Sequence, residues 1–115
     1  MANTFKLITK AGVTSADVIY TVAGSTTTVI LGLMLGNTTS SSVNATVTIE
    51  TDTGNRSGNN DEANQNVELL TTTAIPGNST LELLGGNKVV METTDVLKVT
   101  GSGALDVTLS VMEIT

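Results

Sequence analysis

The sequence lacks two residue types on which many catalytic and metal sites depend. It contains no cysteine and no histidine. Without cysteine there is no disulfide, no thiolate zinc site, no iron–sulfur cluster and no thiol catalysis. Without histidine, the usual general base near neutral pH and the commonest transition-metal ligand are both missing. We therefore expect no catalytic residue, no cofactor and no enzymatic activity.

Aromatic and basic side chains are also scarce. Phe5 and Tyr20 are the only aromatic residues, and Lys and Arg together number 5 in a chain with a net charge of -6. The basic residues are scattered, whereas a protein that binds nucleic acid normally carries a clustered basic patch. We therefore expect no binding to nucleic acid. A carbohydrate-binding module usually stacks sugars on exposed rings, so the lack of aromatics weakens that alternative.

Long apolar runs are absent as well. The longest, Val29 to Leu35, spans only about seven residues, and a membrane-spanning helix needs about 20. The N-terminal residues do not show the charged start and apolar run of a signal peptide. We therefore expect neither membrane insertion nor export.

The abundant residues favour β-sheet. Thr and Ser together number 31, and Val, Leu and Ile dominate the apolar set. β-Branched side chains suit the half-buried surface of a sheet. A length of 115 residues is typical of one domain. We expect a single domain over residues 1–115, with residues 1–10 as an extended N-terminal arm or an edge strand.

Alternation of apolar and polar residues predicts about eight or nine short strands. They cover residues 5–9, 17–23, 26–35, 43–50, 67–73, 81–83, 88–91, 96–100 and 105–114. The residues expected to point inward are Val18, Tyr20, Val22, Val43, Ala45, Val47, Ile49, Leu105, Val107, Leu109 and Val111. The turn at Gly85-Gly86-Asn87 predicts a hairpin between its flanking strands. This pattern predicts an all-β fold, an antiparallel β-sandwich of jelly-roll or immunoglobulin-like topology.

The strand predicted over Thr26 to Leu35 is apolar on both faces. Ile30 and Met34 lie on the face opposite Leu33, and an exposed apolar stripe is typical of an interface. Together with Phe5 and Leu7 they are our candidate interface residues. We expect a homo-oligomer and favour a trimer. The alternative is that this strand is central and covered by loops.

Other polar clusters have ordinary explanations. The loop Thr51 to Asn66 carries Asp52, Asn55, Asn59, Asn60, Asp61 and Glu62. These oxygen ligands could hold Ca²⁺, but Asn, Asp and Gly are also the usual residues of a solvated loop. Glycosylation sequons begin at Asn37, Asn44, Asn55 and Asn78, and about two or three are expected by chance in a chain so rich in Ser and Thr.

The carboxylates Asp95, Asp106 and Glu113 lie in or beside the C-terminal strands. A pair of carboxylates can hydrolyse glycosides. These three alternate with apolar positions, so we expect them on the solvent face of the strands.

Several segments together resemble a known group of proteins. They are residues 19–24, 29–33, 36–42, 75–79, 81–84, 86–91, 95–99 and 105–110. In this order they are similar to the small β-sandwich virion proteins of tailed bacteriophages, especially marine and cyanobacterial phages. The similarity covers about residues 17 to 115 and consists of strand and turn patterns.

The resemblance implies a structural protein of the virion, made in the host cytoplasm. Two places in the particle fit: a capsid cement (decoration) protein bound outside the head, or a tail, fibre or baseplate part. The implied partners are the major capsid protein or other virion proteins. We favour the cement role because the chain has no heptads or shaft repeats of a fibre and no second domain to join baseplate parts.

Overall fold

The computed structural model describes residues 2–51 and 64–115, and these residues form nine β-strands and no helix. In chain order the strands are β1 (Asn3–Val13), β2 (Asp17–Thr21), β3 (Thr27–Asn37), β4 (Val43–Thr51), β5 (Gln65–Ile75), β6 (Thr80–Glu82), β7 (Val89–Met91), β8 (Val96–Gly101) and β9 (Leu105–Ile114). The all-β prediction is confirmed, and the N-terminal segment is an edge strand.

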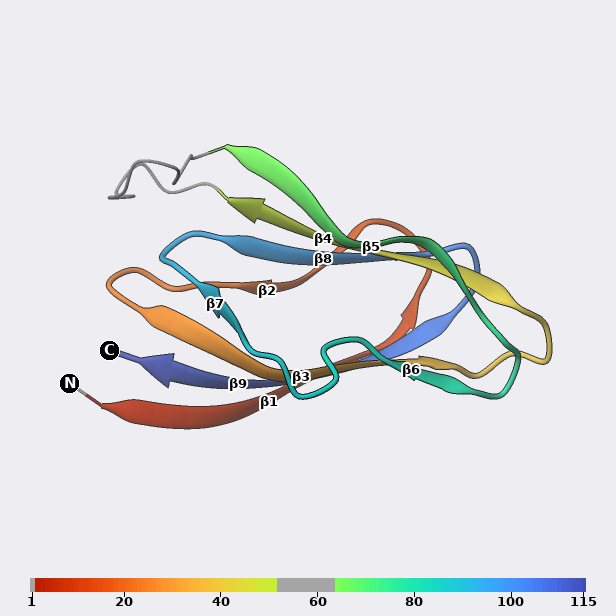
Figure 1. The fold of residues 1–115 in the computed structure, drawn as a ribbon, viewed down its shortest axis with the longest axis horizontal. Helices are drawn as coiled ribbons and strands as arrows, with labels where there is room; N and C mark the ends of the chain where they lie inside the picture. The colour runs from red at the N-terminus through yellow and green to blue at the C-terminus, as the bar shows by residue number, and fades with distance from the viewer. Residues whose placement is uncertain (1, 52–63) are drawn as a thin grey trace.

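The strands form two antiparallel sheets that pack face to face (Figure 1). The first sheet has the order β1-β9-β3-β6, with β7 also paired to β3. The second sheet has the order β2-β8-β4-β5. The two ends of the chain lie at the same end of the sandwich, where β1 and β9 run side by side (Figure 1).

The pairing distinguishes between the two predicted topologies. β1 pairs with β9, β2 with β8, β3 with β6 and β7, and β4 with β5. The chain is therefore one long hairpin, wrapped so that successive pairs fall alternately in the first and the second sheet. This arrangement is a jelly roll and not an immunoglobulin sandwich.

The core lies between the sheets and is purely aliphatic at its centre. Every inward position predicted on β4 and β9 is buried. The largest side chains that are fully buried are Ile30, Leu33, Leu35, Ile75, Met91, Leu97, Leu105 and Leu109. Burying one such side chain contributes about 1.5–3 kcal/mol, so the core supplies the main favourable term in folding.

Two strands do not follow the predicted faces. In β2 the pairing shifts between Val18 and Tyr20, which leaves Val18 exposed and buries Ile19. The predicted inward position was therefore wrong for Val18, whereas Val22 is buried and Tyr20 packs against the core, as predicted. A bulge inserts an extra residue into the pairing and reverses which side chains point inward beyond it.

The predicted hairpin at Gly85-Gly86-Asn87 is also absent. β6 and β7 do not pair with each other, because both pair antiparallel with β3. β6 lies opposite residues 34–36 and β7 opposite residues 28–30. They are two pieces of one interrupted edge strand, and the glycines sit in the loop that interrupts it.

A buried asparagine fixes the far end of β3. Asn37 Nδ2 donates to the carbonyl oxygens of Ser41 at 2.8 Å and Ile75 at 2.9 Å. Its Oδ1 accepts from the backbone N–H of Thr39 at 2.9 Å. One side chain thus joins β3, the turn that follows it and the end of β5.

Candidate interaction surface

The outer face of the first sheet, which is turned away from the core, carries a continuous apolar row. Phe5 of β1 lies opposite Met112 of β9, Met112 lies opposite Val29 of β3, and Val29 lies opposite Val90 of β7. We call Phe5, Met112, Val29 and Val90 the apolar row. It crosses the whole width of the sheet, from one edge strand to the other.

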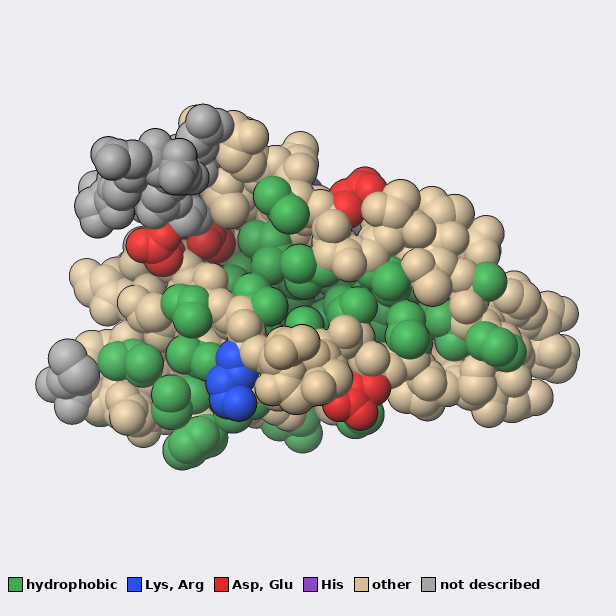
Figure 2. All heavy atoms as spheres, viewed as in Figure 1, with side chains coloured by type: hydrophobic (Ala, Val, Ile, Leu, Met, Phe, Trp, Pro, Cys, Tyr) green, Lys and Arg blue, Asp and Glu red, His purple; other side chains and the backbone are tan. Residues whose placement is uncertain are grey.

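The most exposed apolar side chains of the described residues gather on this sheet. Of the six large hydrophobic side chains that are exposed in the described residues, four lie on the first sheet: Phe5 (70%), Leu7 (66%), Val90 (61%) and Met34 (43%). Hydrophobic side chains project along the lower margin of the molecule, where β1 runs (Figure 2). Such a concentration on one face is typical of an interaction surface.

Side chains in the neighbouring rows project from the sheet to different heights, so this face is uneven. Beside the apolar row, Leu7 pairs with Ser110, and Ser110 pairs with Gly32. Ser110 has a small side chain, and a Cβ added at Gly32 would meet no atom within 4 Å apart from its two neighbours in the chain. We call Leu7, Ser110 and Gly32 the low row, because Ser110 on β9 and Gly32 on β3 leave the surface low there, while Leu7 projects at the β1 end of the row. Beyond it the surface rises again at Met34.

The outer face of the second sheet is polar by contrast. Thr46, Thr48 and Glu50 of β4 lie opposite Thr100, Lys98 and Val96 of β8. Lys98 Nζ lies 2.9 Å from Glu50 Oε2, so the charges on this face are partly paired with each other. The two faces therefore differ in kind, and only the first sheet presents an extended apolar surface.

Three of the four predicted interface residues lie on this apolar face. Phe5, Leu7 and Met34 are exposed on it, whereas Ile30 is fully buried. The assignment of Ile30 to an exposed stripe was wrong, because the pairing of β3 shifts between Ile30 and Gly32. That bulge places Ile30 and Leu33 on the same inward side.

Three members of the apolar row were missed from the sequence. Val29, Val90 and Met112 become neighbours only through pairing between strands that are far apart in the chain. The one available signal was alternation in β9, which puts Met112 on the outward face opposite Val111.

A polar group joins the two sheets at one end of the core. The Tyr20 hydroxyl of β2 donates to Glu113 Oε2 of β9 and lies 2.7 Å from the Thr28 hydroxyl of β3. Lys6 Nζ of β1 lies 2.9 Å from Glu113 Oε1. Glu113 is thus held by two partners, and its predicted position on the solvent face was wrong.

This arrangement shifts two ionisations in opposite directions. Burial and the hydrogen bond to Glu113 raise the pKa of Tyr20 to about 12. The hydrogen bonds from Tyr20 and Lys6 hold the pKa of Glu113 below its ordinary value. Both shifts favour a neutral phenol beside a charged carboxylate. The group is suited to holding the two sheets together. Because its pKa is raised, Tyr20 would be a poor general acid at neutral pH.

The other two candidate carboxylates each accept a hydrogen bond from the backbone. Asp95 is buried and accepts from the backbone N–H of Glu92 at 3.0 Å, so its predicted solvent position was wrong. Asp106 is exposed, as predicted, and accepts from the backbone N–H of Gly12 at 3.1 Å. Within residues 2–51 and 64–115, no three acidic side chains gather as a metal site. The absence of enzymatic activity stays a prediction.

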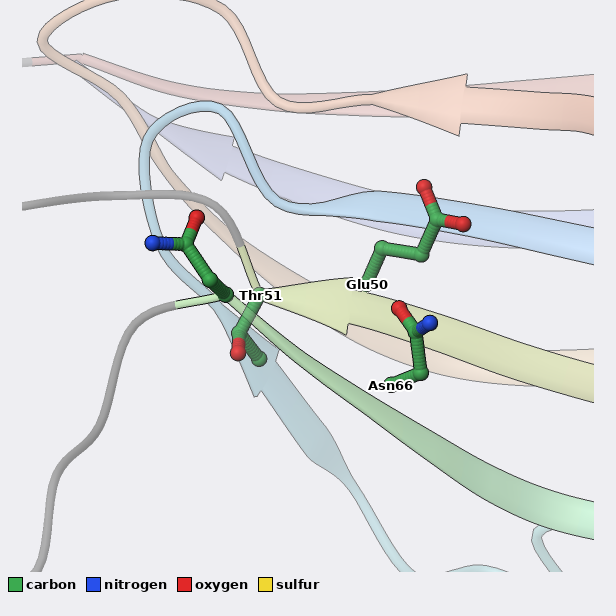
Figure 3. Close-up of a pocket in the computed structure, with 4 residues that line it drawn as sticks. Glu50, Thr51 and Asn66 are labelled. Atoms are coloured by element: carbon green, nitrogen blue, oxygen red, sulfur yellow. The ribbon is translucent and has the colours of Figure 1, made fainter.

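A polar depression lies where β4 and β5 leave the sandwich. It is lined by Glu50, Thr51, Asn64 and Asn66, and the side chains of Glu50 and Asn66 lie side by side (Figure 3). The six oxygen-bearing residues proposed for Ca²⁺, Asp52 to Glu62, lie outside the described residues. Of the described lining residues only Glu50 is acidic, and it already contacts Lys98.

The sequons divide by burial. Asn37 is buried, so its side chain cannot accept a glycan, whereas Asn44 and Asn78 are exposed. Asn55 lies outside the described residues.

No protein-family model matches the chain, and a search of curated proteins finds no significant match. In the described part of the chain, no helix is long and apolar enough to cross a membrane.

Proposed function

We propose that this chain is a structural protein of a bacteriophage virion, and specifically a capsid cement protein that braces neighbouring subunits on the outside of the head. The observation that carries the proposal is the apolar outer face of the first sheet, which includes Phe5, Leu7 and Met34. The resemblance of the strand and turn segments to phage virion proteins supports it independently.

The fold is compatible with this role. Jelly rolls recur in viral capsid domains, although they also occur in lectins and enzymes, so the fold alone does not choose a function. A cement protein needs many modest contacts that repeat with the symmetry of the shell, since avidity then replaces strong single contacts. An apolar sheet face of one small domain can provide such a contact.

Binding of this kind would stabilise the shell selectively. A protein that binds assembled capsid subunits in preference to free ones shifts the equilibrium toward the assembled state. In this proposal the partner is the major capsid protein, and copies of the chain occupy equivalent positions around the head.

The copy number in purified particles tests the proposal. Symmetry-repeated binding predicts on the order of hundreds of copies per virion by quantitative mass spectrometry. A count below about fifty would instead support a tail, fibre or baseplate role and end the cement proposal.

A pair of variants tests the surface itself. Leu7→Glu places a charge on the apolar face and should abolish binding to particles. Val18→Glu changes an exposed apolar side chain on the second sheet and should leave binding unchanged. Equal binding of the two variants would show that the particle contacts another surface.

A carbohydrate-binding role finds less support. Phe5 is the one exposed aromatic ring, because the Tyr20 hydroxyl is engaged with Glu113 and Thr28. Sugar sites normally use broad aromatic faces. Saturable binding on a glycan array would favour this alternative.

A further inference from the structure

We propose that the outer face of the first sheet binds the same face of a second copy of this chain across a two-fold axis. The inference deepens the proposed function by naming what covers this surface in the free protein, before the face meets the capsid. It rests on that face being an assembly surface, but it does not require a particle.

The charge of the face favours a copy of the same chain as partner. The chain has a net charge of -6, so two copies repel each other in most orientations. A face without charged side chains is where two copies can meet with least repulsion. The apolar row and the low row contain no charged residue, and Glu82 on the same sheet lies opposite Met34, outside both rows. A strongly basic partner binds best to a surface that carries acidic side chains, and these two rows contain none.

The face has the size that a stable contact requires. The first sheet has three strands of 10 or 11 residues and two of 3 residues; at about 3.3 Å per residue and about 4.8 Å between strands they give a footprint on the order of 600 Å². Because side chains add relief, the accessible area is larger and approaches the roughly 800 Å² per partner of a standard interface. Within that footprint, Phe5, Leu7 and Val90 are the most exposed large apolar side chains.

The relief of the face is self-complementary. The raised apolar row lies next to the low row, which dips at Ser110 and Gly32. A two-fold axis between the rows places the apolar row of each copy over the low row of the other. A contact in which one patch meets itself is isologous and therefore two-fold, whereas a ring of three requires two different complementary patches. This geometry favours a dimer over the trimer expected from the sequence.

Pairing through the edge of β1 is less favourable than pairing through the face. β1 carries Lys6 and Lys10 and no acidic residue, and its pairing with β9 shifts between Lys10 and Val13. Lysines and bulges on an edge strand are features that prevent strand addition.

Light scattering coupled to gel filtration tests the inference. The chain has a mass of 11.8 kDa, and we expect twice that mass at micromolar concentration. Leu7→Glu should halve the observed mass, and the matched variant Val18→Glu should leave it unchanged. Circular dichroism of both variants shows whether the fold is retained, which is expected because both side chains are exposed.

Cysteine cross-linking locates the contact. The chain has no cysteine, so Ser110→Cys introduces a single thiol beside the expected axis. Oxidation should give a disulfide-linked dimer, and Thr46→Cys on the outer face of the second sheet should give none. A monomer, a trimer, or a dimer that persists in Leu7→Glu would overturn the inference. A monomer in solution would leave the copy number in the virion untouched, so the two proposals can fail separately.

Discussion

At the scale of single residues, Tyr20 is the side chain that fastens one sheet to the other. Its phenol proton goes to Glu113, so the Thr28 hydroxyl must donate to the phenol oxygen. Thr28 is fully buried and needs this partner. The only tyrosine of the chain is thus a structural cross-brace, and it also provides a spectroscopic probe.

The raised pKa of Tyr20 predicts a loss of stability at alkaline pH. The folded state holds the phenol proton more tightly than the unfolded chain, so this contribution is complete below the ordinary value of 10.0. It is lost as the pH rises from there to about 12. We expect phenolate absorbance to titrate near the upper value when folded and near the lower value in urea.

The variant Tyr20→Phe provides the control for this prediction. It removes the titrating group, so the part of the alkaline loss that is due to Tyr20 should disappear. At neutral pH the variant should be less stable by about 1–2 kcal/mol in urea denaturation, because Thr28 and Glu113 lose a partner. An unchanged alkaline profile would contradict the role given to Tyr20.

The lowered pKa of Glu113 acts at the other end of the pH range. Its contribution is complete above the ordinary glutamate value and is lost as the pH falls through the lower folded value. Glu113→Gln should flatten this acid limb of the stability profile, measured as the urea midpoint at each pH.

The buried side chain of Asn37 is the second for which we expect a large contribution to the stability of the fold. Asn37→Ala leaves the carbonyl groups of Ser41 and Ile75 without their donor in a buried setting. We expect a loss of about 2–4 kcal/mol in urea denaturation. The exposed Asn44→Ala should change stability by no more than about 0.5 kcal/mol. A similar effect of the two variants would contradict the importance assigned to this network.

At the scale of elements, the turn after β5 packs closely on the turn after β3. A Cβ at Gly77 would lie 2.4 Å from the carbonyl oxygen of Ser40. We expect Gly77→Ala to cost about 1–3 kcal/mol, because the clash is with backbone and cannot be relieved by a rotamer change. Gly24→Ala meets nothing within 4 Å and should be neutral or stabilising by up to about 1 kcal/mol. Thermal denaturation of both variants checks the contrast.

Strand faces could be predicted from the sequence only for strands that carry no bulge themselves, since the extra residues in the pairings of β4 and β9 lie in their partners β5, β3 and β1. β4 and β9 alternate strictly, and their inward residues were correct. β2 and β3 contain bulges, which depend on the partner strand and leave no local signal in a period of two. For this reason Ile30 was assigned to the surface.

The candidate site was predictable only in part for a related reason. Phe5, Leu7 and Met34 stand out locally as apolar residues in a strand. The apolar row, however, exists only because β1, β9, β3 and β7 lie next to one another. Local alternation does not specify which of several antiparallel partners a strand will choose, and the wrongly predicted hairpin of β6 and β7 has the same origin.

At the scale of the whole molecule, the pairing of β1 with β9 joins the two ends of the chain. Ala2 and Thr115 exchange backbone hydrogen bonds of 3.1 and 3.0 Å. Closing a loop of this length is entropically costly, and contacts between distant segments slow folding. This pairing is therefore expected to form late.

A circular permutant tests that expectation. Residue 115 is joined to residue 2 by a short linker, and new ends are opened between Gly85 and Gly86, where the loop is exposed. β9 and β1 then form a local hairpin, so we expect the permutant to fold faster than the natural order. Stopped-flow refolding followed by Tyr20 fluorescence measures the rate. A slower rate would mean that the order of the other strands limits folding.

The same adjacency of the two ends determines how the domain responds to mechanical force. β1 and β9 are antiparallel, and both ends lie on one side of the sandwich (Figure 1). A force that pulls the ends apart loads their hydrogen bonds one after another, beginning at Ala2 and Thr115. The pair therefore unzips at low force. A force applied between Val13, at the opposite end of β1, and the C-terminal end of β9 would instead act along the two strands. It would load all of these hydrogen bonds at the same time, so the pair would resist a far greater force.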